Sequence, residues 1–219
     1  MTHRRHVFRS RRYALPVTGQ TIAEGLRRRR EVSDDEFDEL FPTSQRLRSG
    51  FHWTPVEVAL RAAALLAPDA SRRVLDIGAG VGKLCLIGAL TTEASWSGIE
   101  RDPKMVHAAT AAARKLGVAE RVRFSEGEVI GVDWDAFDAF YLFNPFAERL
   151  IFAADAAPIR RDIYHEHIAL VQRQLARTRP GTRVVTYHGF GADELPGFDL
   201  VLREPARNDH LCLWVRTAW

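Results

Sequence analysis

Cysteine is scarce in this chain, with only Cys85 and Cys212 among 219 residues, and both lie in apolar stretches. They form no C-x-x-C pair and lack the Cys/His spacing of a zinc site, so we expect reduced thiols and no metal. Long apolar runs are also missing: none approaches the roughly 20 residues that span a membrane, and the N-terminus has no apolar signal core. These absences predict a cytoplasmic protein without a membrane span.

Acidic residues are scarce near the N-terminus, where residues 1–30 contain nine arginines, two histidines and a single acid, Glu24. The whole chain carries a net charge of only +3, so the remainder is acidic overall. A clustered cationic arm can dock on nucleic acid, anionic lipid or an acidic protein, and the alternative is a solvated leader. We therefore describe residues 1–32 as a basic, partly disordered extension that could contact nucleic acid.

Two capping boxes follow this extension. The first, at residues 33–36, predicts a short helix that ends near residue 41. The second, at residues 54–57, has proline at the first helical position and predicts a helix over 55–67. We expect residues 33–70 to form an N-terminal helical segment.

From residue 71 to 219 the pattern alternates between strands and helices, which predicts one further domain. The expected strands cover 73–78, 96–100, 121–124, 136–144 and 182–188, and the expected helices cover 82–91, 103–116 and 159–178. The last two apolar runs, 198–203 and 211–217, have no helix between them and read as an antiparallel hairpin. The prediction is an α/β fold: a doubly wound, mostly parallel seven-stranded sheet with a C-terminal antiparallel hairpin.

The most informative stretch runs from Val74 to Gly82, with Asp76 followed by glycines at 78, 80 and 82. It reads as a buried strand, a glycine-rich turn and a helix, a unit that lets a ligand approach the backbone and meet helix N–H groups. The dinucleotide pattern G-x-G-x-x-G is absent, which disfavours a nicotinamide-binding domain. The pattern D-x-G-x-G-x-G resembles the first motif of class I methyltransferases that depend on S-adenosylmethionine (SAM), whose fold is a Rossmann-like seven-stranded sheet.

This resemblance implies SAM as the cofactor, bound beyond the carboxyl ends of the parallel strands. Gly78 and Gly80 would leave room for the methionine part of SAM. That part carries a sulfonium and an ammonium group, so an acid such as Asp76 is electrostatically favourable beside it.

Two further acids follow later strands. Glu100 comes eighteen residues after Gly82, where a carboxylate can accept hydrogen bonds from the ribose hydroxyls. Glu128 follows the third strand, where an acid commonly meets the adenine amino group in the family that this chain resembles, with Glu126 as the alternative. The predicted cofactor contacts are Asp76, Gly78, Ala79, Gly80, Gly82, Glu100, Arg101 and Glu128.

The fourth strand of the predicted sheet ends in Asn144, Pro145 and Phe146. This place resembles the fourth methyltransferase motif, where amino-group methylases often carry Asn or Asp, then proline, then an aromatic residue. The Asn144 side-chain carbonyl can accept an N–H bond from the acceptor and so orient the nitrogen lone pair towards the methyl group. Pro145 fixes the backbone, and Phe146 offers a packing or cation–π surface. We predict these three residues as the catalytic group.

The layout over residues 50–190 is similar to that of seven-stranded protein lysine methyltransferases and of bacterial class I methyltransferases of unassigned substrate. A lysine acceptor must lose a proton, which desolvation in an aromatic pocket favours. Trp53, Phe146 and Tyr187 are candidates for that pocket, and His188 for a base or polar contact.

The sequence therefore predicts a methyltransferase acting on a nitrogen, with a leaning to a protein amine. Three alternatives stay open. One is an RNA methyltransferase that grips its substrate with the arginine-rich N-terminus, and another is a small-molecule methyltransferase. The third is a non-enzymatic SAM-binding protein.

Overall fold

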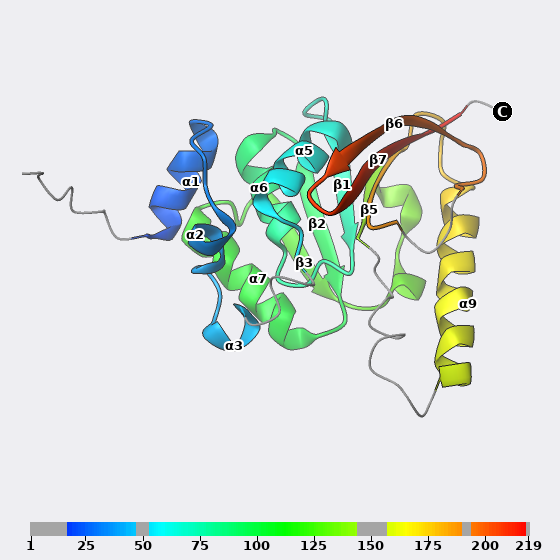
Figure 1. The fold of residues 1–219 in the computed structure, drawn as a ribbon, viewed down its shortest axis with the longest axis horizontal. Helices are drawn as coiled ribbons and strands as arrows, with labels where there is room; N and C mark the ends of the chain where they lie inside the picture. The colour runs from blue at the N-terminus through cyan, green and yellow to red at the C-terminus, as the bar shows by residue number, and fades with distance from the viewer. Residues whose placement is uncertain (1–16, 47–52, 144–156, 190–193, 218–219) are drawn as a thin grey trace, which may run out of the picture.

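The computed structural model describes residues 17–46, 53–143, 157–189 and 194–217, without the side chains of residues 157–162. Its centre is one seven-stranded sheet with the strand order β3-β2-β1-β4-β5-β7-β6 (Figure 1). The strands are β1 (Arg73–Ile77), β2 (Ser95–Glu100), β3 (Val122–Glu126), β4 (Ala139–Phe143), β5 (Arg183–Tyr187), β6 (Phe198–Ala206) and β7 (Asp209–Arg216). Strands β1 to β5 pair in parallel, and β7 runs antiparallel between β5 and β6. The predicted fold class is confirmed.

Helices cover both faces of the sheet, and Figure 1 shows α9 on one side with α6 and α7 on the other. The described helices are α1 (Gly19–Arg27), α2 (Asp34–Asp38), α3 (Thr43–Arg46), α5 (Val56–Leu66), α6 (Lys83–Thr91), α7 (Pro103–Leu116) and α9 (Ala157–Leu175). Alternate residues of a strand point to opposite faces, so each strand contributes to two apolar cores. On β4, Tyr141 joins the core shared with α5 and α6, while Phe140 and Leu142 join the core under α9.

The arginine-rich extension contains a helix that its composition did not predict. Thr18 caps α1 through a capping box with Thr21, and Ile22 and Leu26 are buried in the same core as residues of α6 and α7. These two apolar side chains are one helical turn apart and give α1 an apolar face that the arginine count hides. The division of the chain at residues 32 and 70 stays a prediction, and residues 1–16 lie outside the described part.

The second predicted capping box is wrong in its detail. Helix α5 begins at Val56 after Pro55, and no side chain from its own segment caps it. The cap comes instead from α2, because the Val56 N–H donates to Asp34 Oδ1 at 2.8 Å. The Thr54 hydroxyl is hydrogen-bonded to Tyr141 Oη of β4 at 3.0 Å instead of to the start of α5.

Element boundaries differ most around β4 and the hairpin. The fourth strand is expected to begin at residue 136, but Ala136 ends a short 3-10 turn, Trp134–Ala136, and the strand starts only at Ala139. Strands β6 and β7 are longer than predicted, because the strand continues through Pro205 and the chain turns within residues 207–208. A proline is tolerated there since β6 is the edge strand and its missing N–H breaks no ladder inside the sheet.

Candidate cofactor and acceptor site

The glycine turn is fastened to the end of β2 by its own N–H groups. Gly78 and Ala79 both donate to the Ile99 carbonyl oxygen at 3.0 Å, and Gly80 donates to Glu100 Oε2 at 3.0 Å. Gly78 and Gly80 have φ angles of 77° and 56°, in the left-handed region that favours glycine. The turn therefore holds a fixed shape at the carboxyl ends of β1 and β2.

The third glycine of the motif serves packing. Gly82 has a φ of 77°, and a Cβ atom there would lie 2.3 Å from Phe124 Cζ. Since Phe124 belongs to β3, Gly82 lets the start of α6 approach the sheet closely. Its predicted contact with the cofactor stays a prediction.

A small cavity opens beside the turn and brings together several of the predicted residues. Its walls are Trp53, Thr54, Asp76, Gly78, Ala79, Val81, Lys83, Leu84, Tyr141 and Phe143. Asp76 and Gly78 come from the end of β1, while Tyr141 and Phe143 come from the neighbouring strand β4. Trp53 is buried, and its indole N–H has no hydrogen-bond partner among the residues that the structure describes. The cavity thus holds an acid, an unpaired donor and an aromatic wall.

Asp76, the acid that lines this cavity, has a raised pKa. Its side chain is 5% exposed, and burial together with the nearby charge of Glu100 raises its pKa to about 8. The Cys85 thiol lies 3.8 Å from Asp76 Oδ2 and opposes the shift only in part. A carboxyl group held in this way favours a proton, and a bound cation can take the place of that proton.

Glu100 is held in place by two backbone N–H groups at the end of β2. Oε2 accepts from Gly80 at 3.0 Å and Oε1 accepts from Asp102 at 2.9 Å. The exposed Arg101 follows it directly, and Gly127 N donates to the Glu100 carbonyl oxygen at 3.0 Å. That last bond brings the end of β3 beside Glu100, and Glu128 follows there as an exposed residue. The structure therefore places all the predicted cofactor residues along one edge of the sheet.

The predicted acceptor residues follow β4 and β5. Asn144, Pro145 and Phe146 lie outside the described residues. Strands β4 and β5 are in register through Phe143 and Tyr187, whose ring centroids lie 5.0 Å apart. The next residue of β5, His188, stacks on Phe143 at 5.3 Å. Phe143 lines the cavity as well, so it joins the cofactor side of the site to the acceptor side.

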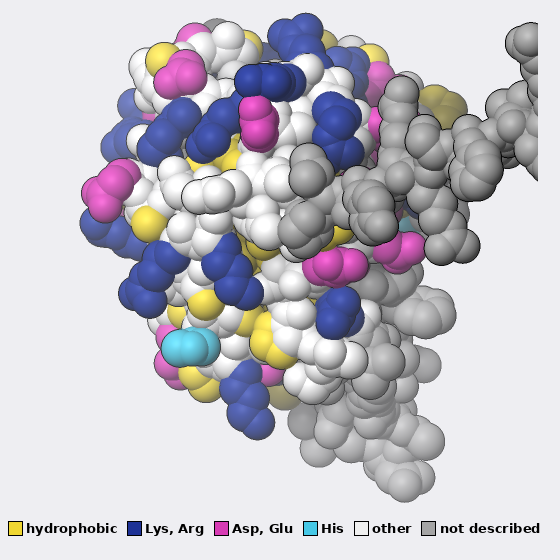
Figure 2. Space-filling view, turned by 90° about the vertical axis from the view of Figure 1, so that its left-hand side faces the viewer, with side chains coloured by type: hydrophobic (Ala, Val, Ile, Leu, Met, Phe, Trp, Pro, Cys, Tyr) yellow, Lys and Arg dark blue, Asp and Glu magenta, His cyan; other side chains and the backbone are white. Residues whose placement is uncertain are grey.

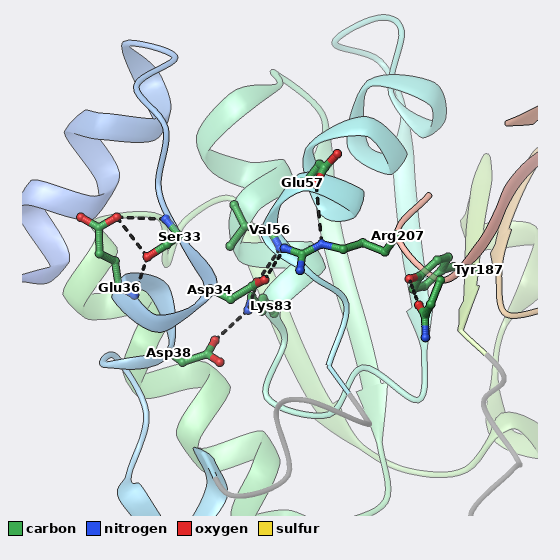
Figure 3. A network of polar contacts seen from close by, with 10 residues as sticks. Ser33, Asp34, Glu36, Asp38, Val56, Glu57, Lys83, Tyr187 and Arg207 are labelled. Carbon is green, nitrogen blue, oxygen red and sulfur yellow. Dashed lines mark hydrogen bonds and ion pairs between the residues drawn. The ribbon is translucent and has the colours of Figure 1, made fainter. Parts of the chain in front are cut away.

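A buried charge network beside the cavity was not predicted (Figure 3). Lys83, the first residue of α6, is 3% exposed and donates to Asp34 Oδ1 at 2.8 Å and to Asp38 Oδ1 at 2.7 Å. Asp34 Oδ2 also accepts from Arg207 of the β6–β7 turn at 2.8 Å. These partners are far apart in the sequence, and no local pattern links them. Through Asp34 the network ties α2, α5, α6 and the hairpin together next to the glycine turn.

We expect Asp34→Asn to lower the free energy of unfolding by about 2 kcal/mol at pH 7, because it removes a charge from the buried Lys83. Burial opposes ionisation of Asp34, but Lys83, the Val56 N–H and Arg207 outweigh it and lower its pKa. A depressed folded pKa gives stability that is present above about pH 4 and is lost as the pH falls further. Urea unfolding at pH 7 and pH 3.5 should therefore show a difference that shrinks in acid. Asp35→Asn, in the same helical turn but exposed, is the control and should change stability little.

Residues 68–165 match a protein family described as a methyltransferase domain. Solved structures resemble the chain as well. An RNA methyltransferase from Salinibacter ruber, in complex with S-adenosyl-L-homocysteine, has 22% identity and a TM-score of 0.54, with 75% of this chain and 91% of that chain covered. TrmN from Thermus thermophilus has 19% identity and a TM-score of 0.57, with 84% of this chain and 53% of that chain covered. A search of curated protein sequences gives no match.

A third similar structure is a SAM-dependent O-methyltransferase from Thermotoga maritima, with 15% identity, a TM-score of 0.51, and 74% of this chain and 66% of that chain covered. Likenesses at these identities show the fold. The family match over residues 68–165, the strand order and the glycine turn together define the class: this part of the chain is a class I methyltransferase domain, and its cofactor is SAM. No helix in the described ranges is long and apolar enough to cross a membrane.

Proposed function

We propose that this methyltransferase transfers its methyl group to a nitrogen atom, and specifically to an amine of a protein side chain such as lysine. The observation that carries the proposal is the aromatic wall of the cavity, where Trp53, Tyr141 and Phe143 meet and Tyr187 packs behind Phe143. Burial among aromatic side chains removes water from an amine and so disfavours its charged form, which leaves the nitrogen with the free electron pair that methyl transfer needs. Asn144, which orients the nitrogen in the sequence-based prediction, follows Phe143 directly.

The described residues fit SAM as the methyl donor. Asp76 supplies the negative charge for the methionyl ammonium, Trp53 an unpaired donor, and Glu100 a fixed carboxylate for the ribose hydroxyls. Gly78 and Gly80 keep side chains away from the turn. Bound SAM supplies a methyl group on a positively charged sulfur, which makes that carbon the site of attack. The residues of the chain bind, orient and exclude water.

Glu100→Gln should weaken the binding of S-adenosylhomocysteine (SAH) about tenfold or more. Glu100 accepts hydrogen bonds from two backbone N–H groups, and the amide NH₂ of glutamine would face one of them, so that hydrogen bond is lost. The oxygen that remains carries no charge, which weakens its hydrogen bonds. Calorimetric titration with SAH measures the change. Glu120→Gln is the matched control, because Glu120 is exposed and precedes β3, at the opposite end of that strand from Glu126 and Glu128. Equal affinities of the wild type and Glu100→Gln would contradict the assignment.

A specific observation favours RNA as a second candidate acceptor. Figure 2 shows many Lys and Arg side chains on the face that carries α1 and α7. Arg27 to Arg30 are consecutive and exposed, and Lys104, Arg114 and Lys115 of α7 are exposed as well. Such a surface can neutralise phosphates. Two of these arginines already pair with carboxylates, Arg28 with Glu24 at 2.8 Å and Arg30 with Glu36 at 3.3 Å, which reduces the free positive charge.

Label transfer separates the two acceptors. The purified protein is incubated with methyl-labelled SAM and a cell extract pre-treated with either protease or nuclease. The protein-amine proposal predicts label in the nuclease-treated sample and none after protease. Label that disappears only after nuclease would establish the RNA acceptor instead, and label that survives both treatments would point to a small molecule.

A further inference from the structure

His188 stands at the acceptor side of the site in an unusual conformation. It is the residue directly after β5, and its φ of 55° puts a non-glycine residue in the left-handed region. Such a conformation costs on the order of 1 to 3 kcal/mol and persists only where the surroundings hold it. The backbone turn directs the imidazole onto Phe143, with ring centroids 5.3 Å apart and an interplanar angle of 24°. Phe143 lines the cavity, so the His188 ring is separated from the cavity by the Phe143 ring alone.

The imidazole is oriented by a carboxylate. His188 Nδ1 lies 2.8 Å from Asp209 Oδ2, and the His188 side chain remains 27% exposed. An ionised carboxylate only accepts hydrogen bonds, so Nδ1 carries the hydrogen and the lone pair of the neutral ring lies on Nε2. This is the arrangement in which an acid holds a histidine in the tautomer of a base.

The turn between β6 and β7 holds Asp209 in position. Three consecutive residues at this turn bind other parts of the chain: Arg207 binds Asp34 of α2, Asn208 accepts from the Tyr187 hydroxyl of β5 at 3.0 Å, and Asp209, the first residue of β7, binds His188. Figure 3 shows the first of these contacts, from Arg207 to Asp34. Asp209 Oδ1 also accepts from the His210 N–H at 2.7 Å. With both oxygens engaged, Asp209 keeps the histidine ring fixed.

From this geometry we propose that His188 is the general base of the methyl transfer and that Asp209 is its positioning residue. The inference rests on the proposed function, an amine acceptor. An N–H bond of the acceptor ammonium breaks, the proton passes to His188 Nε2, and the electron pair stays on the nitrogen. That pair then forms the N–C bond to the methyl group, while the electrons of the S–C bond remain on sulfur.

Two variants of His188 separate a base from a structural residue. Glycine and asparagine both tolerate a positive φ, so neither variant strains the turn. His188→Gly also opens space for added imidazole, whereas His188→Asn fills it. Asp209→Asn can donate to Nδ1 and so shift the ring hydrogen to Nε2, which removes the lone pair that acts as the base. His107→Ala, an exposed histidine of α7 outside the cavity, is the matched control.

The test measures initial rates of label transfer from methyl-labelled SAM to nuclease-treated cell extract, and SAH affinity by calorimetry. We expect both His188 variants to lose about a hundredfold or more in rate with SAH affinity unchanged within about twofold. Asp209→Asn should lose rate in the same way. Added imidazole should restore transfer in His188→Gly and leave His188→Asn inactive, and the His107 control should match the wild type.

Wild-type rates in the His188 variants, or a loss that imidazole does not restore in His188→Gly, would overturn the assignment of the base. A different result identifies failure of the proposed function. If the wild-type protein binds SAH and labels RNA in untreated extract but no protein, the amine acceptor is wrong, and the ammonium deprotonation assigned to His188 falls with it.

Discussion

Asp76→Asn should weaken SAH binding about a hundredfold and at the same time make the ligand-free protein more stable at alkaline pH. The two effects have one cause, the buried carboxyl group whose pKa is raised to about 8. With ligand bound, its charge pairs with the methionyl ammonium, and removing one partner of a buried pair costs about 3 kcal/mol. Without ligand, burial and the charge of Glu100 both oppose ionisation of this carboxyl group, and asparagine removes the cost of ionising it.

The size of the stability effect follows from the pKa shift. The folded-state pKa lies above the unfolded value of about 3.8, so the folded protein binds the extra proton and its stability falls as the pH rises from about 4 to about 8. At one pKa unit per 1.4 kcal/mol, Asp76→Asn should gain on the order of 5 kcal/mol at pH 8 and above. For a protein of this size the melting temperature should rise by on the order of 10 °C or more.

Melting curves between pH 5 and pH 9 and calorimetric titrations with SAH test both halves of this expectation. Asp199→Asn on the edge strand β6 is the control, since that aspartate is exposed and far from the cavity residues in the strand order. A variant that binds SAH like the wild type would remove Asp76 from the cofactor site. A melting profile parallel to that of the wild type would show that the carboxyl group is not perturbed by burial.

Gly82→Ala should be the most damaging single-methyl change in the glycine turn, with a loss of about 3 to 5 kcal/mol in the free energy of unfolding. Two costs add at this position. The φ of 77° is unfavourable for alanine, and the new Cβ would lie 2.3 and 2.4 Å from two ring atoms of Phe124 and 3.1 Å from Ala109 Cβ. Urea unfolding, monitored by tryptophan fluorescence, measures the loss.

Gly117→Ala separates the two costs. Gly117 ends α7 with a φ of 68°, and a Cβ atom there would meet nothing within 4 Å. Alanine at Gly117 should therefore cost only the backbone term, about 1 to 2 kcal/mol. The double variant Gly82→Ala/Phe124→Leu should recover part of the loss, because leucine withdraws the ring atoms from the new methyl group. Equal losses at Gly82 and Gly117 would show that the close approach of α6 to β3 is not a constraint.

The parts of this structure that the sequence predicts are those whose causes are local. The helix expected over 103–116 is found with these bounds as α7, because its start and its end are set locally, by the capping side chain of Asp102 and by Gly117 in the left-handed conformation. The order of strands and helices followed from apolar runs and glycine turns. The parallel pairing of β1 and β2 brings the ends that carry Asp76 and Glu100 to one edge of the sheet, as expected, and their binding of the cofactor stays a prediction.

The parts that the sequence does not predict depend on partners distant along the chain. Asp34 caps α5 and binds Lys83 and Arg207, and nothing near residue 34 in the sequence indicates those partners. The raised pKa of Asp76 depends on its burial and on the nearby charge of Glu100, and both arise only when the chain is folded. Asp209 sits at a hairpin turn, and only the antiparallel pairing of β7 with β5 brings it to His188.

Calorimetric titration of the wild-type protein with SAH at pH 7, repeated in two buffers of different ionisation enthalpy, tests the central claim most directly. The account predicts binding of one equivalent, with release of a proton as Asp76 ionises beside the incoming ammonium, and no such release in Asp76→Asn. Absence of binding by the folded wild-type protein would contradict the assignment of the SAM site.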